Sequence, residues 1–151
     1  MTAIAYDNPP LEEIHQIRPL WDELRIYTRD INTHFKSYYE NLDFEERIQK
    51  FSQPGVRANI DVAIDRASGR IVGYALASVD AEQMGELDSF YVLEEFRRMG
   101  IGDELLTRAI AWMKRQKPRQ MMILTAVQNR EVLALYARHG FYPRLIMLNH
   151  E

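Results

Sequence analysis

The sequence of 151 residues contains no cysteine. This excludes disulfides, thiolate metal sites and any mechanism that passes through an acyl-cysteine. The sequence also lacks long apolar runs, and none approaches the ~20 residues that a transmembrane helix needs. Its first residues, MTAIAYD, show no basic stretch followed by an apolar one. No signal peptide is therefore predicted, and we expect a cytoplasmic protein with no membrane partner.

The sequence also has no excess of positive charge. The 19 lysines and arginines are outnumbered by 22 acidic residues, which gives a net charge of −3. No basic field or stripe would attract nucleic acid or anionic lipid, so we expect neither as a partner. The contents of 46% apolar and 27% charged residues are ordinary for a globular protein. The length predicts a single domain over residues 1–151.

Several common site motifs are absent from the sequence. There is no Gly-Lys-Ser/Thr for a P-loop and no Gly-x-Ser-x-Gly elbow for a serine nucleophile. No cluster of His, Asp and Glu has metal-ligand spacing, so no metal is expected. A dinucleotide-binding fingerprint would need a glycine at position 105, where the chain has leucine.

Hydrophobic periodicity predicts strands that alternate with helices. The region 30–39 shows no clean period, and Pro118 prevents the preceding helix from continuing. The predicted order is β-α-α-β-β-β-α-β-α-β, an α+β fold with a mixed, mostly antiparallel twisted sheet and helices on both faces. Strands are expected at 3–6, 60–64, 71–79, 86–92, 121–127 and 141–148, and helices at 11–28, 44–51, 101–116 and 130–138.

The most informative segment joins the strand at 86–92 to the helix at 101–116. It contains Arg97-Arg98-Met99-Gly100-Ile101-Gly102. Glycines allow the backbone to approach a ligand closely, and the first amides of a helix have no partner within it. Such amides bind anions, above all phosphate, and two arginines lie beside them. The alternative is that the two glycines merely form a tight turn.

Two spacings together indicate a family. Arg97-x-x-Gly100-x-Gly102, after a strand that ends in Tyr91-Val92, resembles the pyrophosphate loop of the GNAT family of acetyl-CoA-dependent N-acetyltransferases. Asn129-x6-Tyr136-x3-Gly140-Phe141 looks like the second signature of that family. The resemblance covers about residues 60–145 well and the N-terminal part by general layout.

The resemblance implies acetyl-CoA as cosubstrate and assigns residues to it. The strand at 90–92 is expected to separate from its neighbour at a bulge, so that free main-chain amides contact the pantetheine arm. Asn129, just before the last helix, could cap that helix, bind the same arm, or do both. The expected cofactor-binding residues are Phe90, Tyr91, Val92, Arg97, Arg98, Met99, Gly100, Ile101, Gly102, Asp103 and Asn129.

Three residues are candidates for catalysis. By resemblance, Tyr136 protonates the leaving thiolate; alternatively it is an ordinary core tyrosine. Glu86 and Asp88 are two residues apart on a strand, so their side chains share a face. Either could be the general base that activates an amine, and Glu86 matches the position of the base in some family members. The alternative is that these carboxylates pair with arginine or face solvent.

The expected activity is direct transfer of an acetyl group to a primary amine of a small molecule or of a protein. The alternative is a non-catalytic module that binds acyl-CoA as a sensor. Acceptor contacts are expected from Tyr27, His34, Phe35 and Tyr38, in or beside the irregular aromatic stretch. Family members often form homodimers, and this is the remaining partner that the resemblance suggests.

Overall fold

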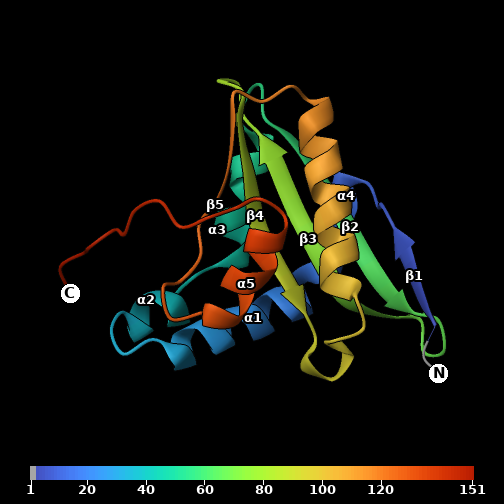
Figure 1. Cartoon of the computed structure of the whole chain (residues 1–151), viewed down its shortest axis with the longest axis horizontal. Helices are drawn as coiled ribbons and strands as arrows, with labels where there is room; N and C mark the ends of the chain where they lie inside the picture. Colours follow the sequence, from blue (N-terminus) through green and yellow to red (C-terminus); the bar gives the residue numbers. More distant parts are fainter. Residues whose placement is uncertain (1–2) are drawn as a thin grey trace.

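The structure, a computed structural model, describes residues 3–151 and contains a five-stranded sheet in the order β1-β2-β3-β4-β5 (Figure 1). Strands β1 to β4 pair antiparallel, whereas β5 lies parallel to β4. The predicted mixed, mostly antiparallel sheet is confirmed. The strands are β1 (Ile4–Asp7), β2 (Arg57–Asp65), β3 (Arg70–Val79), β4 (Met84–Val92) and β5 (Gln120–Ile123).

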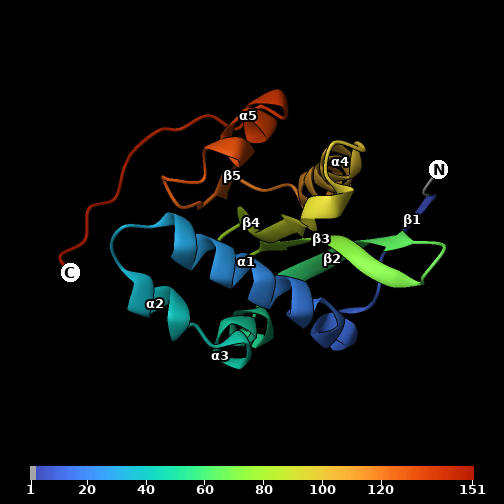
Figure 2. The ribbon, with the colours of Figure 1, turned by 90° about the horizontal axis from the view of Figure 1, so that it is seen from below.

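Helices cover both faces of this sheet, as expected. Figure 2 shows α1, α2 and α3 below the sheet and α4 and α5 above it. The α-helices are α1 (Arg18–Ile31), α2 (Lys36–Glu40), α3 (Phe44–Ile48), α4 (Ile101–Arg115) and α5 (Arg130–Arg138). Short 3-10 segments, η1 (Leu11–Ile17), η2 (Gln49–Ser52) and η3 (Glu94–Phe96), precede α1, follow α3 and follow β4.

The first predicted helix is divided in two. Instead of one helix over 11–28, η1 leads into α1, and Glu13 inside η1 has non-helical dihedrals. Pro19 explains the break, because its ring is tolerated only in the first turn of an α-helix. The apolar stripe was predicted correctly, since Ile17 and Leu20 are buried against the sheet.

The core has two layers, one on each face of the sheet. On the α1 face, Trp21 packs edge-on against Phe44 with ring centroids 5.3 Å apart. On the other face, Leu105 and Met113 of α4 are completely buried. Burial of a side chain of this size contributes about 1.5–3 kcal/mol, so these layers hold α1 and α4 in fixed positions relative to β4.

Strand β5 is shorter than predicted. It ends at Ile123, although the apolar run continues to residue 127. Leu124 and Val127 are 69% and 56% exposed. After Ile123 the chain leaves the sheet and turns into α5, with the Asn129 amide bonded to the Ala126 carbonyl at 2.9 Å. Apolar composition alone therefore overestimated the length of the strand.

The predicted last strand, 141–148, is wrong for this structure. Residues 141–151 form no helix or strand, and nearly all of them are exposed. The Phe141 amide still bonds the Tyr136 carbonyl at 3.0 Å, but beyond it the chain runs away from the sheet (Figure 1). The sequence pattern indicates a tendency to form a strand, but a strand also needs a partner, and this segment runs away from β5, the last strand of the sheet.

Candidate functional site

A cavity of about 770 Å³ lies where β4 ends and the chain passes to α4. Its walls come from α1, the end of β4, the loop after η3, the first turn of α4, and α5. The lining residues are Leu24, Tyr27, Phe90, Tyr91, Val92, Glu94, Phe96, Arg97, Arg98, Gly100, Ile101, Gly102, Asp103, Asn129, Glu131, Val132, Leu135 and Arg138. Most residues predicted to bind acetyl-CoA are therefore brought together.

Strand β4 carries the irregularity that was expected from the resemblance. In its pairing with β3, Leu76 is opposite Ser89 and Ala77 is opposite Leu87, so Asp88 is an extra residue. Pairing with β5 ends at Leu87. Within the described residues, the edge of β4 that faces away from β3 has no strand partner from Asp88 to Val92, which leaves main-chain groups free for a ligand.

The loop before α4 is shaped by two left-handed residues. Arg98 has a φ of 64° and Gly100 a φ of 80°. Gly100 is the N-cap of α4 and provides no side-chain cap, and the Glu104 amide donates to its carbonyl at 3.1 Å. The amides of Ile101, Gly102 and Asp103 precede the first helical bond and lie at the cavity, where the helix dipole favours an anion.

Glycine at position 102 was expected to let the backbone approach a ligand, but the structure shows a packing reason for it. A Cβ atom here would lie 3.2 Å from Leu135 and 3.3 Å from Phe90, both of them side chains of the cavity wall. Gly102 therefore allows α4 to pack closely on α5 and β4. The conformation that requires glycine because of its positive φ belongs to Gly100.

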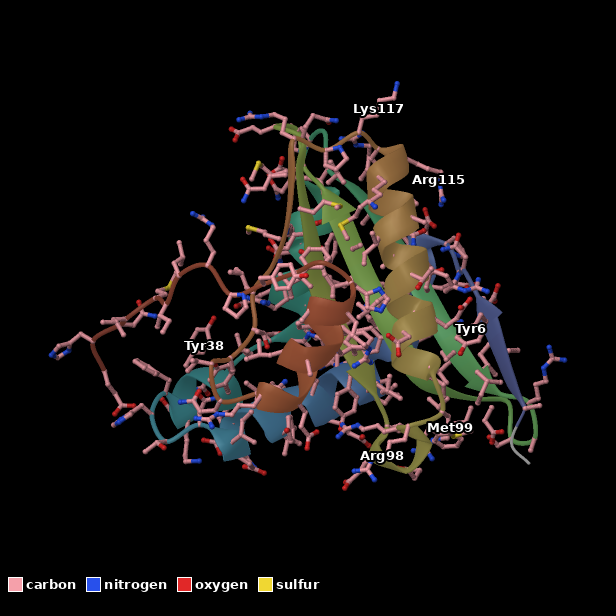
Figure 3. The ribbon with its side chains drawn as sticks, viewed as in Figure 1. Tyr6, Tyr38, Arg98, Met99, Arg115 and Lys117 are labelled. Carbon is pink, nitrogen blue, oxygen red and sulfur yellow. The ribbon has the colours of Figure 1, made fainter. Side chains whose placement is uncertain are left out.

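The two arginines of the loop, Arg97 and Arg98, differ in their contacts and in their exposure. The Arg97 Nε donates to the Val92 carbonyl at 2.9 Å, and its guanidinium lies over the rings of Tyr91 and Tyr27 at 5.3 and 5.9 Å. Arg97 thus braces the end of β4 against α1 while it lines the cavity. Arg98 is exposed at the mouth of the loop (Figure 3) and forms no ion pair within residues 3–151. Its charge is available to an anion.

Asp103 and Met99 are less suited to binding CoA than the sequence predicted. The Asp103 carboxylate accepts from Arg138 at 3.0 Å and from His139 at 2.8 Å, and these contacts hold its pKa below its usual value. Only the amide of Asp103 suits a phosphate. Met99 is 44% exposed and does not line the cavity, although it lies on the same loop (Figure 3).

Helix α5 forms the wall opposite α1. Asn129 is the N-cap residue of α5, but its side chain makes no capping bond, so that alternative is wrong. Asn129 as a whole is 7% exposed and lines the cavity, and its side-chain amide makes no hydrogen bond within the described chain. This side-chain amide is therefore free to bind a ligand atom.

Tyr136 lies behind the cavity wall rather than on it. It is 7% exposed, and its ring centroid is 6.1 Å from that of Phe90. Burial raises the pKa of Tyr136, so the phenol stays protonated at neutral pH. A protonated phenol is the form that a general acid requires.

The two candidate bases share a face of β4, as predicted, and both contact Lys50. The Lys50 ammonium lies 3.1 Å from Glu86 and 2.5 Å from Asp88. The Asp88 side chain is only 9% exposed, and burial raises its pKa to about 6 although the Lys50 hydrogen bond opposes this. The Asp88 Oδ2 atom is buried and has no hydrogen-bond partner among residues 3–151. The carboxylates pair with lysine, where the alternative prediction named arginine.

The four predicted acceptor contacts are not brought together. Tyr27 lines the cavity. His34 is exposed and its Nδ1 lies 3.2 Å from Glu151, while the Phe35 amide donates to the same carboxylate at 2.6 Å. Tyr38 is 55% exposed on α2, away from the loop at α4 (Figure 3).

The predicted site residues did not include Lys50 or seven residues that line the cavity: Leu24, Glu94, Phe96, Glu131, Val132, Leu135 and Arg138. Lys50 lies 36 residues before Glu86, and nothing local relates them. Leu24 could have been found, because it shares the helical stripe of Tyr27. Within residues 3–151, no helix is long and apolar enough to cross a bilayer, and no group of three or more His, Asp or Glu could hold a metal ion.

The structure thus has a sheet that splits between β4 and β5, with a glycine loop leading into α4. The chain is similar in fold to a solved Pyrococcus furiosus protein, with a TM-score of 0.76, 20% identity and 99% of each chain covered. It is also similar to the aminoglycoside N-acetyltransferase AAC(6')-Iy bound to a CoA bisubstrate analogue, with a TM-score of 0.61, 19% identity and 99% of each chain covered.

The model of the acetyltransferase (GNAT) family matches residues 18–141, so the chain belongs to this family. An uncharacterized N-acetyltransferase of Methanocaldococcus jannaschii is 23% identical over 132 residues. That match covers 83% of this chain and 58% of the length of the archaeal protein.

Proposed function

We propose that this protein transfers the acetyl group of acetyl-CoA directly to a primary amine. The observation that carries the proposal is the meeting of three features at one cavity: free amides at the start of α4, the unpaired edge of β4 and the unpartnered Asn129 amide. Together they match the diphosphate, the pantetheine arm and the thioester of one extended ligand.

In this proposal the diphosphate binds the amides of Ile101, Gly102 and Asp103, and Arg98 adds charge. The Asn129 amide and the free edge of β4 hold the pantetheine arm. A β4 amide polarises the thioester carbonyl, which becomes negative as the amine attacks. Holding both reactants in line supplies much of the rate enhancement.

Proton transfer completes the reaction. The amine must lose a proton, and the Glu86–Asp88 pair accepts it, directly or through water. Asp88 is the better candidate of the two, because its pKa near 6 leaves it mostly ionised at neutral pH and still basic enough to accept a proton. Tyr136, whose ring centroid lies 6.1 Å from that of the cavity residue Phe90, donates a proton to the departing thiolate.

The rival function is a sensor that binds acyl-CoA without turnover. A pure sensor needs no carboxylate with a raised pKa at the start of the unpaired edge of β4, and Asp88, which does not itself line the cavity, is such a group. The relatives solved as aminoglycoside acetyltransferases suggest cationic amines as the first acceptors to test.

The test is release of free thiol from acetyl-CoA with a panel of amines, including aminoglycosides, polyamines, amino acids and lysine peptides. We expect thiol release that depends on one class of amine, with a product heavier by one acetyl group. Saturable binding of acetyl-CoA with no turnover on any amine would instead favour the sensor.

A further inference from the structure

A second cavity, of about 460 Å³, lies between α4 and the end of the sheet formed by β1 and β2. We call it the β1 cavity. It shares no lining residue with the cavity at the start of α4, so it is a separate space that the proposed reaction does not use. Its lining comes from two sides, with Asn8, Asn59 and Asp61 on the sheet side and Arg108, Trp112 and Arg115 on α4.

Helix α4 provides one wall of the β1 cavity. Arg108, Trp112 and Arg115 are spaced by four and three residues, so they share one face of the helix. The Arg108 guanidinium lies 4.8 Å from the centre of the Tyr6 ring on β1, and its Nε donates to Glu104 at 2.9 Å. Arg115 is exposed on the side of α4 that faces β1 (Figure 3) and forms no ion pair among residues 3–151. One arginine thus bridges α4 and β1, and the other is available to a ligand.

The sheet side of the β1 cavity holds a buried carboxylate. Asp61 on β2 is only 4% exposed. The Asn59 side-chain amide donates to the Asp61 Oδ2 at 2.8 Å, and the Asn8 side-chain amide donates to the Asn59 Oδ1 at 2.7 Å. These bonds hold the carboxylate in place, but no lysine, arginine or histidine among residues 3–151 forms an ion pair with it. Because a buried charge is normally paired, this site suits a cationic group from a ligand.

The two arginines act on Asp61 without contacting it. Burial raises the pKa of Asp61, whereas the Asn59 hydrogen bond and the charges of Arg108 and Arg115 lower it. The β1 cavity therefore has a negative group on the sheet side and positive groups on the helix side. A purely cationic ligand would be repelled by the arginines, and a purely anionic one by Asp61. A ligand that carries one charge of each sign matches both walls.

We propose that the β1 cavity binds a free α-amino acid with an apolar side chain. Its ammonium pairs with Asp61, and its carboxylate pairs with Arg115, whose fork of N–H donors suits a carboxylate. Its side chain packs against the half-buried indole of Trp112. The volume of the cavity lies within the range of small-molecule sites. The proposal concerns a second site and is independent of the acetyl transfer reaction.

The indole N–H resonance of Trp112 reports on this site directly. Trp21 is the other tryptophan of the chain and is buried in the core on the α1 face, so it is an internal control. In a titration of the ¹⁵N-labelled protein with L-phenylalanine, we expect a saturable shift of the Trp112 resonance with a midpoint below about 1 mM, while Trp21 stays in place. If neither L-phenylalanine nor L-leucine moves the Trp112 resonance at about 10 mM, the proposal is wrong.

Excess CoA should leave this shift unchanged, because the two cavities share no residue. Loss of the shift when CoA is added would assign the amino acid to the cavity at the start of α4 and would overturn the proposal. Failure of CoA to bind would count against the proposed function alone.

Two analogues of phenylalanine test the charged groups of the ligand. 2-Phenylethylamine lacks the carboxylate, and 3-phenylpropionate lacks the ammonium. Each should bind at least about tenfold more weakly than L-phenylalanine, because each loses a hydrogen-bonded ion pair. If either analogue binds as tightly as L-phenylalanine, the cavity does not recognise a zwitterion and the proposal fails.

Variants test the two walls of the cavity. Arg115→Gln should weaken L-phenylalanine binding at least about tenfold. Lys114→Gln removes the same charge from a neighbour that does not line the cavity, and it should leave the affinity unchanged. Asp61→Asn keeps the shape of the side chain and should weaken binding of L-phenylalanine but not of 3-phenylpropionate. Equal affinity in the Arg115 and Lys114 variants, or unaltered L-phenylalanine binding in Asp61→Asn, overturns the proposal.

Discussion

Among single residues, the Asp88 carboxyl has the most unusual surroundings. It is the extra residue of the β4 bulge, and Lys50 is its charged neighbour. Burial raises its pKa to about 6, while Lys50 works in the opposite direction. The protonated form dominates below that value, so a base at this position loses activity as the pH falls.

We expect kcat/KM to rise with pH through about 6 as Asp88 ionises. Asp88→Asn should remove this limb of the profile and lower kcat/KM about 100-fold, a typical loss for a general base. Lys50→Met should move the limb to higher pH, because the Lys50 contact lowers the pKa of Asp88. Glu86→Gln is the comparison variant. If Glu86→Gln removes the limb and Asp88→Asn keeps it, the base is Glu86.

Tyr136→Phe should lower kcat about 100-fold, since a general acid contributes at least that factor. The KM for acetyl-CoA should change little, because the phenol ring stays in place against Phe90. Tyr6→Phe, on β1 and outside the cavity lining, makes the same chemical change and should leave kcat unaltered. Equal turnover in the Tyr136 and Tyr6 variants would remove Tyr136 from the mechanism.

The sequence predicted residues of this site where they belong to a local pattern. The loop from Arg97 to Gly102 and the position of Asn129 follow from short spacings, and all but Met99 line the cavity. Lys50 could not be predicted, because its contact with Asp88 depends on how η2 packs on the sheet. The different roles of the two arginines could not be predicted either. The hydrogen bond from Arg97 to the Val92 carbonyl, which holds the end of β4 in place, depends on the three-dimensional structure.

At the scale of elements, the loop into α4 depends on the left-handed conformation of Gly100. An alanine in this conformation costs about 1–2 kcal/mol. Gly69 in the β2–β3 hairpin has a similar φ of 72°, and a Cβ atom at either position meets nothing within 4 Å. The two glycines are therefore matched in conformation and surroundings, and they differ in that only Gly100 lines the cavity.

Gly100→Ala and Gly69→Ala should therefore lower the free energy of unfolding by similar amounts, about 1–2 kcal/mol each. Only Gly100→Ala should weaken CoA binding, by about tenfold if its strain moves the α4 amides out of line. Denaturant unfolding and titration calorimetry measure the two effects. If both variants bind CoA with equal affinity, the left-handed conformation of Gly100 does not contribute to CoA binding.

The elements themselves were predictable where the signal was local. Asp43 caps α3 by accepting from the Glu45 amide at 2.8 Å, and the three strands from β2 to β4 follow from alternation and short turns. Two predictions failed for reasons outside the local pattern. The predicted helix over 11–28 ran through Pro19, although η1 ends at Ile17 and Pro19 lies in the first turn of α1. The last predicted strand pairs with no strand of the described residues, because the chain runs away from the β5 edge after Phe141.

At the scale of the whole molecule, the cavity joins elements from both faces of the sheet. α1 and α5 lie on opposite faces of the sheet, and both line the cavity (Figure 2). A ligand that spans them should stabilise the folded state by mass action, because it binds that state alone.

At 100 times its dissociation constant, CoA should add about 2.7 kcal/mol to the free energy of unfolding. For a chain of this size, the melting temperature should then rise by about 5–10 °C. Differential scanning fluorimetry or calorimetry across a CoA series measures this shift. Adenosine, which lacks the diphosphate and the pantetheine arm, is the control and should give a much smaller rise. An equal rise with adenosine would mean that the ligand is held mainly by its base.

The central claim is that the diphosphate of CoA rests on the first amides of α4. The most direct measurement is a titration of the ¹⁵N-labelled protein with CoA, followed through its backbone amide resonances. The account predicts that Ile101, Gly102 and Asp103 show the largest saturable shifts, with Phe90 to Val92 next. Resonances at the start of α4 that stay in place while CoA saturates the protein would contradict it.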